Sequence, residues 1–383
     1  MILWHQLKLR SKDPQVRLKA IESLPVEKSA NARTFELLSA GLQDADPQVR
    51  CAAARVLGEL KDERSVDLLM SILNDRTPSV RQAGATALGT LGNPRAIGLL
   101  TKILKAPNPQ DRASAGAALR SLGWVPATAE ERALFEVAIG NARAAALGGE
   151  AALDPLVSEL RHDTSFARRS AAEALEGLHD TRRIKPLLSA ANDPDPTVRV
   201  SAIHALAAET EQPVMNTFLK ALQDKDACVR LAAAQVLAKR DNPDFVPNFF
   251  KLLGDQNFEI RLATVQYLGR FRHPQITKAL AMLLSDSDSD VRLAAAKNLG
   301  ASNDKAAVEA LVTALVDEER AIRQAAEGAL NQIDPDWTHS EAAHEAALRL
   351  QTSMDSRPAW VRSAISQVLA RLGVSAEKLQ IAE

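Results

Sequence analysis

The sequence is poor in the residues that stabilise small secreted domains or large aromatic cores. Its 383 residues contain two cysteines, four tryptophans and one tyrosine, and aromatic residues make up 4% of the chain. Cys51 and Cys228 are too few and too far apart for a disulfide framework, so a reducing compartment is expected. With 17 glycines, 18 prolines and 46% hydrophobic residues, the chain is neither collagen-like nor disordered.

Net charge is also nearly absent. The 47 Lys and Arg residues balance 48 Asp and Glu residues, which gives a formal charge of −1. This excludes attraction of the whole molecule to nucleic acid or to an anionic membrane, although a local patch remains open. No run of about 20 apolar residues occurs, and the start lacks the basic and apolar regions of a signal peptide. We therefore expect a cytoplasmic protein without a membrane segment.

A short period runs through almost the whole chain. When Arg50 in the stretch Asp46–Arg50 is taken as an anchor, equivalent arginines recur, and seven of the ten successive gaps are 31 residues. One gap of 56 residues equals 31 plus 25 and marks an insertion. A leucine stands seven positions after every anchor. The anchors are Arg17, Arg50, Arg81, Arg112, Arg168, Arg199, Arg230, Arg261, Arg292, Arg323 and Arg362.

The sequence pattern of each repeat predicts two helices. Apolar residues in 65–73 recur at steps of three and four, and a second helix is predicted from about residue 77 to 91. Four positions before the anchor, nine repeats have a residue that can cap a helix: Asp13, Asp46, Thr77, Asn108, Thr164, Asp195, Asp226, Asn257 and Asp288. One such hairpin cannot bury both of its faces, so stacked neighbours must complete the core. The pattern predicts an all-α fold, an α-solenoid.

The opening Asp-Pro-x-Val-Arg, the alanine run, the leucine and the following Leu-Gly resemble HEAT repeats of the short bacterial type named after phycobilisome lyases. The resemblance covers about residues 11–375. It implies a right-handed α-solenoid of about 11–12 hairpins with one insertion after the fourth repeat. The predicted segments are repeats in 1–123, an inserted helical segment in 124–149, repeats in 150–332, and a divergent repeat with a cap in 333–383. A repeat fold does not by itself fix an activity.

Six positions before the anchor, seven repeats have an aspartate. In HEAT proteins the matching Asp and Arg form a ladder between the turns of adjacent repeats, and the resemblance implies the same structural role here. The ladder residues are Asp44, Arg50, Asp75, Arg81, Asp193, Arg199, Asp224, Arg230, Asp255, Arg261, Asp286, Arg292, Asp317 and Arg323. A phosphate-binding stripe of arginines is disfavoured, because each arginine comes with its own acid. The aspartate is replaced by Ser11, Ala106, His162 and Ser356, which predicts interrupted stacking at the ends and beside the insertion.

The insertion contains Trp124 and is predicted to form a helix from a capping box at Thr128 and Glu131 to about residue 139, followed by a short helix in 142–147. Trp4, Trp124 and Trp337 lie outside the regular repeats, and Trp360 lies in the divergent last one. Their positions favour junction packing and end capping over partner binding. Trp124 is nevertheless the first candidate for recognition.

The resemblance places the second helices on the concave face, so their outward residues form a candidate binding surface. Predicted partner-binding residues are Arg55, Glu173, His204, Gln235, Gln266, Lys297 and, from the insertion, Trp124. One position after the anchor, a second column holds Leu18, Leu231, Leu262 and Leu293. A mixed polar column beside an apolar one fits a protein or peptide better than phosphate. An ordinary solvated face with half-covered leucines is an equal alternative.

Catalysis would need titratable groups that converge. Deoxyhypusine hydroxylase is a HEAT-like enzyme that binds iron through several His-Glu pairs, whereas this sequence has only His344-Glu345. Bilin lyases share the repeat type, but their chemistry cannot be inferred from repeats. We therefore expect a non-catalytic scaffold without metal or cofactor that binds a protein or peptide. The alternatives are a bilin-lyase-like or hydroxylase-like oxidoreductase and, less favoured because of charge and aromatic content, a DNA-binding solenoid.

Overall fold

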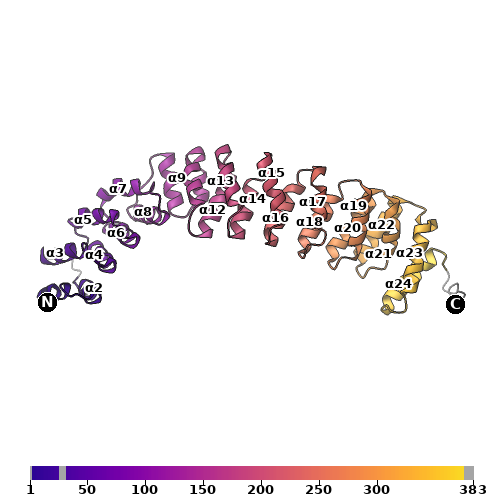
Figure 1. Cartoon of the computed structure of the whole chain (residues 1–383), viewed down its shortest axis with the longest axis horizontal. Helices are drawn as coiled ribbons and strands as arrows, with labels where there is room; N and C mark the ends of the chain where they lie inside the picture. Colours follow the sequence, from indigo (N-terminus) through magenta and orange to yellow (C-terminus); the bar gives the residue numbers. More distant parts are fainter. Residues whose placement is uncertain (1, 26–31, 375–383) are drawn as a thin grey trace. The chain divides into compact units, whose positions relative to one another are not determined.

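The structure, a computed structural model, describes residues 2–25 and 32–374, with side chains from His5 onward. These residues form 24 α-helices joined by turns and short 3-10 segments, and no strand occurs among them (Figure 1). The predicted all-α solenoid is confirmed. The chain divides into two compact units, Met1–Leu206 and Ala207–Glu383. The predicted segment boundaries stay predictions.

Odd-numbered helices are the first helices of the hairpins, and even-numbered helices are the second. In the first unit the hairpins are α1 (Ile2–Leu9) with α2 (Pro14–Glu22), α3 (Ala32–Gly41) with α4 (Pro47–Leu60), α5 (Ser65–Ser71) with α6 (Pro78–Leu91), α7 (Ile97–Ile103) with α8 (Pro109–Ser121), α9 (Ala129–Ala138) with α10 (Ala142–Ala146), α11 (Leu153–Glu159) with α12 (Ser165–Glu176), and α13 (Ile184–Ala190) with α14 (Pro196–Ala205).

The second unit continues the alternation. Its hairpins are α15 (Gln212–Ala221) with α16 (Ala227–Ala238), α17 (Val246–Phe250) with α18 (Phe258–Leu268), α19 (Pro274–Met282) with α20 (Ser289–Ser302), α21 (Val308–Ala314) with α22 (Arg320–Ile333), and α23 (Glu341–Thr352) with α24 (Ala359–Arg371). Among the described residues, no helix is both long and apolar enough to cross a lipid bilayer.

The second helices begin where their caps predict. Asp46 is extended, and its carboxylate accepts hydrogen bonds from the amides of Gln48 and Val49 at 2.8 and 3.3 Å. Side-chain caps of this kind are present at Asp13, Asn108, Asp195, Asp226, Asn257 and Asp288 as well.

The prediction of side-chain caps is wrong at two threonines. Thr77 and Thr164 occupy the cap position, but neither side chain bonds the first turn. The Thr77 hydroxyl accepts a hydrogen bond from Arg50 Nη2 at 3.0 Å, and the Thr164 hydroxyl lies 3.0 Å from His162 Nδ1. Neighbouring side chains therefore compete for these hydroxyl groups.

Stacking of the hairpins buries one leucine in every repeat. The leucine seven positions after each anchor, such as Leu57 or Leu206, is buried in all eleven repeats. Burial of a leucine side chain contributes about 1.5–3 kcal/mol to the free energy of unfolding. These leucines therefore explain why the period is strict.

Glycines allow some second helices to approach closely. A Cβ atom on Gly58 would lie 2.8 Å from the carbonyl oxygen of Ala87 in the next second helix. A Cβ atom on Gly300 would lie 2.9 Å from the Cα atom of Ala329. Backbones therefore meet without an intervening side chain between α4 and α6 and between α20 and α22.

The insertion is a shortened hairpin. Helix α9 begins at the predicted capping box, in which Thr128 and Glu131 each bond the other's backbone, and Gly140 follows its end with a φ of 81°. Helix α9 packs against α8, and α10 packs against α12. Helix α10 has five residues, whereas α6 has 14. The inserted segment thus supplies both helix layers, but its second helix is short.

Candidate functional site

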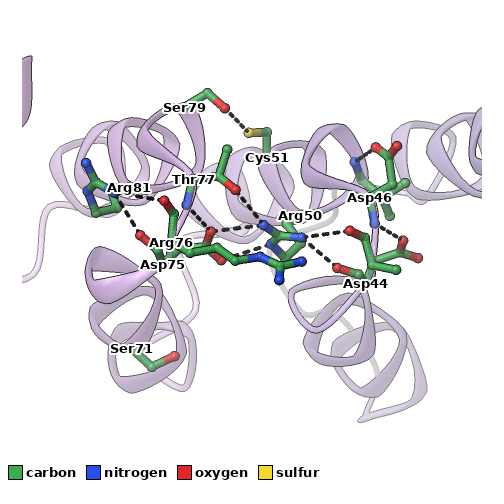
Figure 2. A network of polar contacts seen from close by, with 12 residues as sticks. Asp44, Asp46, Arg50, Cys51, Ser71, Asp75, Arg76, Thr77, Ser79 and Arg81 are labelled. Carbon is green, nitrogen blue, oxygen red and sulfur yellow. Dashed lines mark hydrogen bonds and ion pairs between the residues drawn. The ribbon is translucent and has the colours of Figure 1, made fainter.

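The Asp–Arg ladder is present, and Figure 2 shows its contacts around Arg50. Arg50 Nη1 donates to the carbonyl oxygens of Asp44 and Ala45 in its own repeat, at 2.8 and 3.2 Å. Its Nε and Nη2 atoms donate to the two carboxylate oxygens of Asp75 in the following repeat, both at 2.9 Å. Asp75 in turn accepts the backbone amide of Thr77 at 2.8 Å. A planar guanidinium group can make these four bonds at once, whereas lysine cannot.

The same two-pronged contact recurs in both units. The arginine of one repeat reaches the aspartate of the next in Arg17–Asp44, Arg168–Asp193, Arg230–Asp255, Arg261–Asp286 and Arg292–Asp317. Arg199 donates to the carbonyls of Asp193 and Pro194, and the Asp224 carboxylate accepts the amide of Asp226. The ladder is therefore a structural element of the stacked turns.

The expectation of interrupted stacking beside the insertion is wrong. Arg81, which would face Ala106, pairs instead with Asp111 at 3.0 Å. Arg112, which would face His162, pairs with Glu159 at the end of α11, and both side chains are buried. Arginine is long enough to reach a carboxylate that stands three to five residues from the usual position. The ladder thus passes the α9–α10 hairpin and links α8 directly to α11.

The ladder ends at Arg323. Its Nη1 atom donates to the carbonyls of Asp317 and Glu318 at 2.7 and 2.9 Å. Among the described residues, no carboxylate pairs with it, in agreement with the serine at position 356.

The ladder changes the acidity of its aspartates. Burial raises the pKa of these carboxyl groups, but hydrogen bonds from arginine and from a backbone amide outweigh burial, so the net pKa is below the ordinary value. This holds for Asp44, Asp75, Asp193, Asp255 and Asp286. The aspartates are therefore ionised and already paired, which leaves them unsuited to proton transfer.

A second set of contacts, which the sequence did not predict, lies at the opposite ends of the helices. Arg240 Nη2 donates to the carbonyls of Ala207 and Glu209, both at 2.7 Å, and burial lowers its pKa. Arg270 Nη1 donates to the carbonyl of Ala238 at 2.6 Å. Arg240 thus satisfies the turn before α15, and Arg270 satisfies the end of α16. They stand ten and nine positions after their anchors, so no fixed column of the repeat reveals them.

Second helices line a groove in the first unit. The groove has a volume of about 950 Å³ and lies across α2, α4 and α6. It contains the predicted residue Arg55, and Leu18 from the predicted apolar column. Sequence reasoning missed Gln82 and Glu59, which also line it. The period could have identified them, because Gln82 is one position after its anchor and Glu59 is nine positions after its anchor.

A smaller hollow lies on the second helices of the second unit. It has a volume of about 350 Å³ and is lined by the predicted residues Gln266 and Lys297 together with Leu262 and Leu293. These two leucines are half-buried, as is Leu231, while Gln235 is exposed. The hollow thus combines residues of the polar column and of the apolar column that the sequence analysis placed beside it.

The other predicted contact residues differ in their exposure and in their contacts. His204 is exposed, and Glu173 is half-buried between two arginines. Trp124 is half-buried, and its ring packs edge-on against Phe135 with centroids 5.5 Å apart. Trp337 is buried and donates to Asn331 at 3.0 Å. These two tryptophans pack in junctions, whereas the Trp4 side chain lies outside the described part of the structure.

Comparison with known proteins supports the prediction that the chain consists of repeats. The sequence pattern of HEAT repeats matches residues 4–79, 35–120, 153–215, 215–290 and 276–370. The chain belongs to the HEAT-repeat family. No curated protein sequence matches this HEAT-repeat protein significantly.

Solved structures similar to this HEAT-repeat protein include an engineered protein, YibA of E. coli and the CpcE–CpcF complex of phycocyanin lyase from Nostoc. The engineered protein is 21% identical, with 87% of this chain and 98% of that chain covered and a TM-score of 0.40. YibA is 18% identical, with 74% and 96% covered and a TM-score of 0.35. The lyase complex is 20% identical, with 69% and 93% covered and a TM-score of 0.31.

Potential metal ligands remain dispersed in the described part of this HEAT-repeat protein. No three His, Cys, Asp or Glu side chains there lie close enough to share a metal ion. His344, from the single His-Glu pair, has its Nδ1 atom 2.9 Å from the carbonyl of Ser340. The expected lack of metal and cofactor stays a prediction.

Proposed function

We propose that this HEAT-repeat protein is a non-catalytic scaffold that binds a segment of another protein along the face lined by its second helices. The observation that carries the proposal is the groove across α2, α4 and α6, whose volume of about 950 Å³ exceeds that of a single side chain several times over. Its lining combines the apolar Leu18 and Ala83 with the hydroxyl and amide groups of Thr86 and Gln82. A folded protein segment presents matching apolar and polar groups.

The charges of this groove favour protein over phosphate. Arg55 is the cation that lines it, and its guanidinium group lies 3.1 Å from Glu22 and 3.5 Å from Glu59. A phosphate-binding surface needs cations that are available to the ligand. Here the cation already has two acidic neighbours, so the DNA-binding alternative gains no support from the groove.

The insertion provides a second region for contact. Val125 and Leu147 are among the most exposed large apolar side chains of the protein, and Leu147 is 88% exposed. Contiguous exposed apolar patches of more than a few hundred Å² mark interaction sites on soluble proteins. We include this region in the proposed binding surface, while Trp124 positions it by packing on Phe135.

A photo-crosslinking amino acid at Gln82 tests the proposal in cells that express the full chain. A matched protein carries the same group at Lys102, an exposed position on the first helix α7. We expect a protein adduct from position 82 that Thr86→Trp abolishes and that position 102 does not give. Equal adducts from both positions, or none from position 82, would contradict the scaffold function.

A further inference from the structure

Two clusters of charged side chains lie on the second helices of the first unit. The first place, the acidic triad, consists of Glu22, Arg55 and Glu59. Arg55 lies between the two glutamates, at 3.1 and 3.5 Å, and all three side chains are about half exposed. Two carboxylates share one guanidinium group, so the triad carries one uncompensated negative charge. All three residues line the groove, whereas Lys19 of the same region does not.

The second place, the basic triad, has the opposite sign. Glu173 on α12 lies between Arg143 on α10, at 3.6 Å, and Arg169 on α12, at 3.5 Å. Arg143 is 85% exposed. Arg169 also lies over the ring of Phe166, which is an exposed aromatic side chain, at 5.4 Å from its centroid. Two guanidinium groups share one carboxylate, so this triad carries one uncompensated positive charge.

The groove-lining positions between the triads are uncharged, although Arg120, an exposed residue of α8, stands directly before one of them in the sequence. Five of the six groove residues of α6 stand two positions before and one, two, five and nine positions after the anchor: Ser79, Gln82, Ala83, Thr86 and Thr90. The same positions of α8 hold Gln110, Ala113, Ser114, Ala117 and Ser121. The anchors of both helices, Arg81 and Arg112, are engaged in the ladder. Small neutral side chains at these positions, with Arg120 beside them, therefore separate one charge from the other.

Resting on the proposed function, we propose that the first unit binds an amphipathic helix of a partner protein whose two ends carry opposite charge. The basic end lies over the acidic triad, the acidic end lies over the basic triad, and small or apolar residues lie on α6 and α8. The partner's direction is fixed by these charges, because the reversed helix places like charges together.

The distance between the triads sets the length of the helix. Helix α6, helix α8 and the inserted hairpin follow α4 in turn, and packed helices are about 8–10 Å apart, which gives a span of about 30 Å. At a rise of 1.5 Å per residue, a helix of about 20 residues covers this distance. A helix also satisfies its own backbone groups, so it does not depend on hydrogen bonds from the short side chains of α8, as an extended peptide would.

An unbiased selection tests this inference. A displayed library of helical 24-residue peptides with randomised surface positions is selected on the full chain, and bound peptides are measured by fluorescence anisotropy. We expect the enriched peptides to carry Lys or Arg at one end and Asp or Glu at the other. Raising the salt concentration is expected to weaken them, because exposed charges are screened.

Two double variants invert the two triads separately. Glu22→Lys with Glu59→Lys makes the first triad wholly basic, and Arg143→Glu with Arg169→Glu makes the second wholly acidic. Each is expected to weaken the enriched peptides about tenfold, as two reversed surface contacts do. The control Asp67→Lys on the first helix α5, where Asp67 is 70% exposed, is expected to leave binding unchanged. Circular dichroism melts establish that all variants fold.

The outcomes separate this inference from the proposed function. Peptides that lose binding with Thr86→Trp, yet lack opposite end charges and tolerate both double variants, overturn the inference and leave the scaffold function standing. Peptides that ignore Thr86→Trp, or no enrichment at all, overturn both. When all four inverting substitutions are combined, recovery of binding by a peptide with exchanged end charges supports the inference directly.

Discussion

Loss of the carboxylate at Glu159 is expected to destabilise the protein around the insertion. Arg112 and Glu159 are 5% and 8% exposed, and their ion pair joins α8 to α11. Glu159→Ala leaves the guanidinium group buried with the carbonyls of Ala106 and Pro107 as its remaining acceptors, at 2.9 and 3.0 Å. Removing one member of a buried pair typically costs 3–5 kcal/mol, and the two carbonyls place our expectation at about 3 kcal/mol.

Comparison with a neutral isostere isolates the role of charge. Glu159→Gln keeps an acceptor oxygen, so we expect a loss of only about 1–2 kcal/mol. Urea unfolding followed by circular dichroism gives the free energies. Hydrogen exchange shows whether the amides of α8 and α11 open together, as expected for repeats that stabilise only their neighbours.

An exposed ion pair provides the control. Asp67 and Arg95 are 70% and 62% exposed and lie 3.0 Å apart, so Asp67→Asn is expected to change stability by less than about 0.5 kcal/mol. If Glu159→Ala is as mild as this control, or if exchange in α8 and α11 is unchanged, the ladder does not carry stacking past the inserted hairpin.

Three further predictions concern single buried groups. Tyr267 is the only tyrosine, and burial raises its pKa to about 12, so its ultraviolet titration is expected near that value. The free energy of unfolding is expected to fall from about pH 10 to 12, because only the unfolded phenol ionises in this range. A titration midpoint near 10 would show an exposed ring. Burial raises the pKa of Asp255, but Arg230 and a backbone amide lower it below the ordinary value, so its stabilisation is present above about pH 4 and lost as the pH falls further. Asp255→Asn is therefore expected to flatten the acid limb in urea melts, and an unchanged limb refutes the pairing. Leu206→Ala is expected to cost about 2–5 kcal/mol in the same melts, and a cost below about 0.5 kcal/mol would contradict its burial.

Much of the fold could be predicted because stacking imposes the same demands on every repeat. Each hairpin needs a buried leucine at one point, such as Leu57, and a cap at another, such as Asp46. These demands recur at a fixed spacing, so they are visible in a single sequence. Thr77 was mistaken for a capping side chain because its competitor, Arg50, comes from another repeat.

The candidate site was predictable only where it followed the period. Columns of the repeat located Arg55 and Gln266 in their hollows, since residues at equal positions share a face. Asp111 and Glu159 escaped prediction, because the side chain of arginine reaches acids that stand outside the column. Arg143 escaped because it belongs to the insertion, which has no equivalent in the other repeats.

The close approach at Gly58 makes the contact between α4 and α6 different from the contacts that α8 and α12 make with their neighbours. Ala87 meets bare backbone there, whereas the position eight residues after the anchor holds Arg120 in α8 and Glu176 in α12. A single methyl group at such a point forces two neighbouring hairpins to open or tilt. Curvature in a chain of this kind can therefore be adjusted by point substitutions, one joint at a time, while the number of repeats and the ladder stay the same.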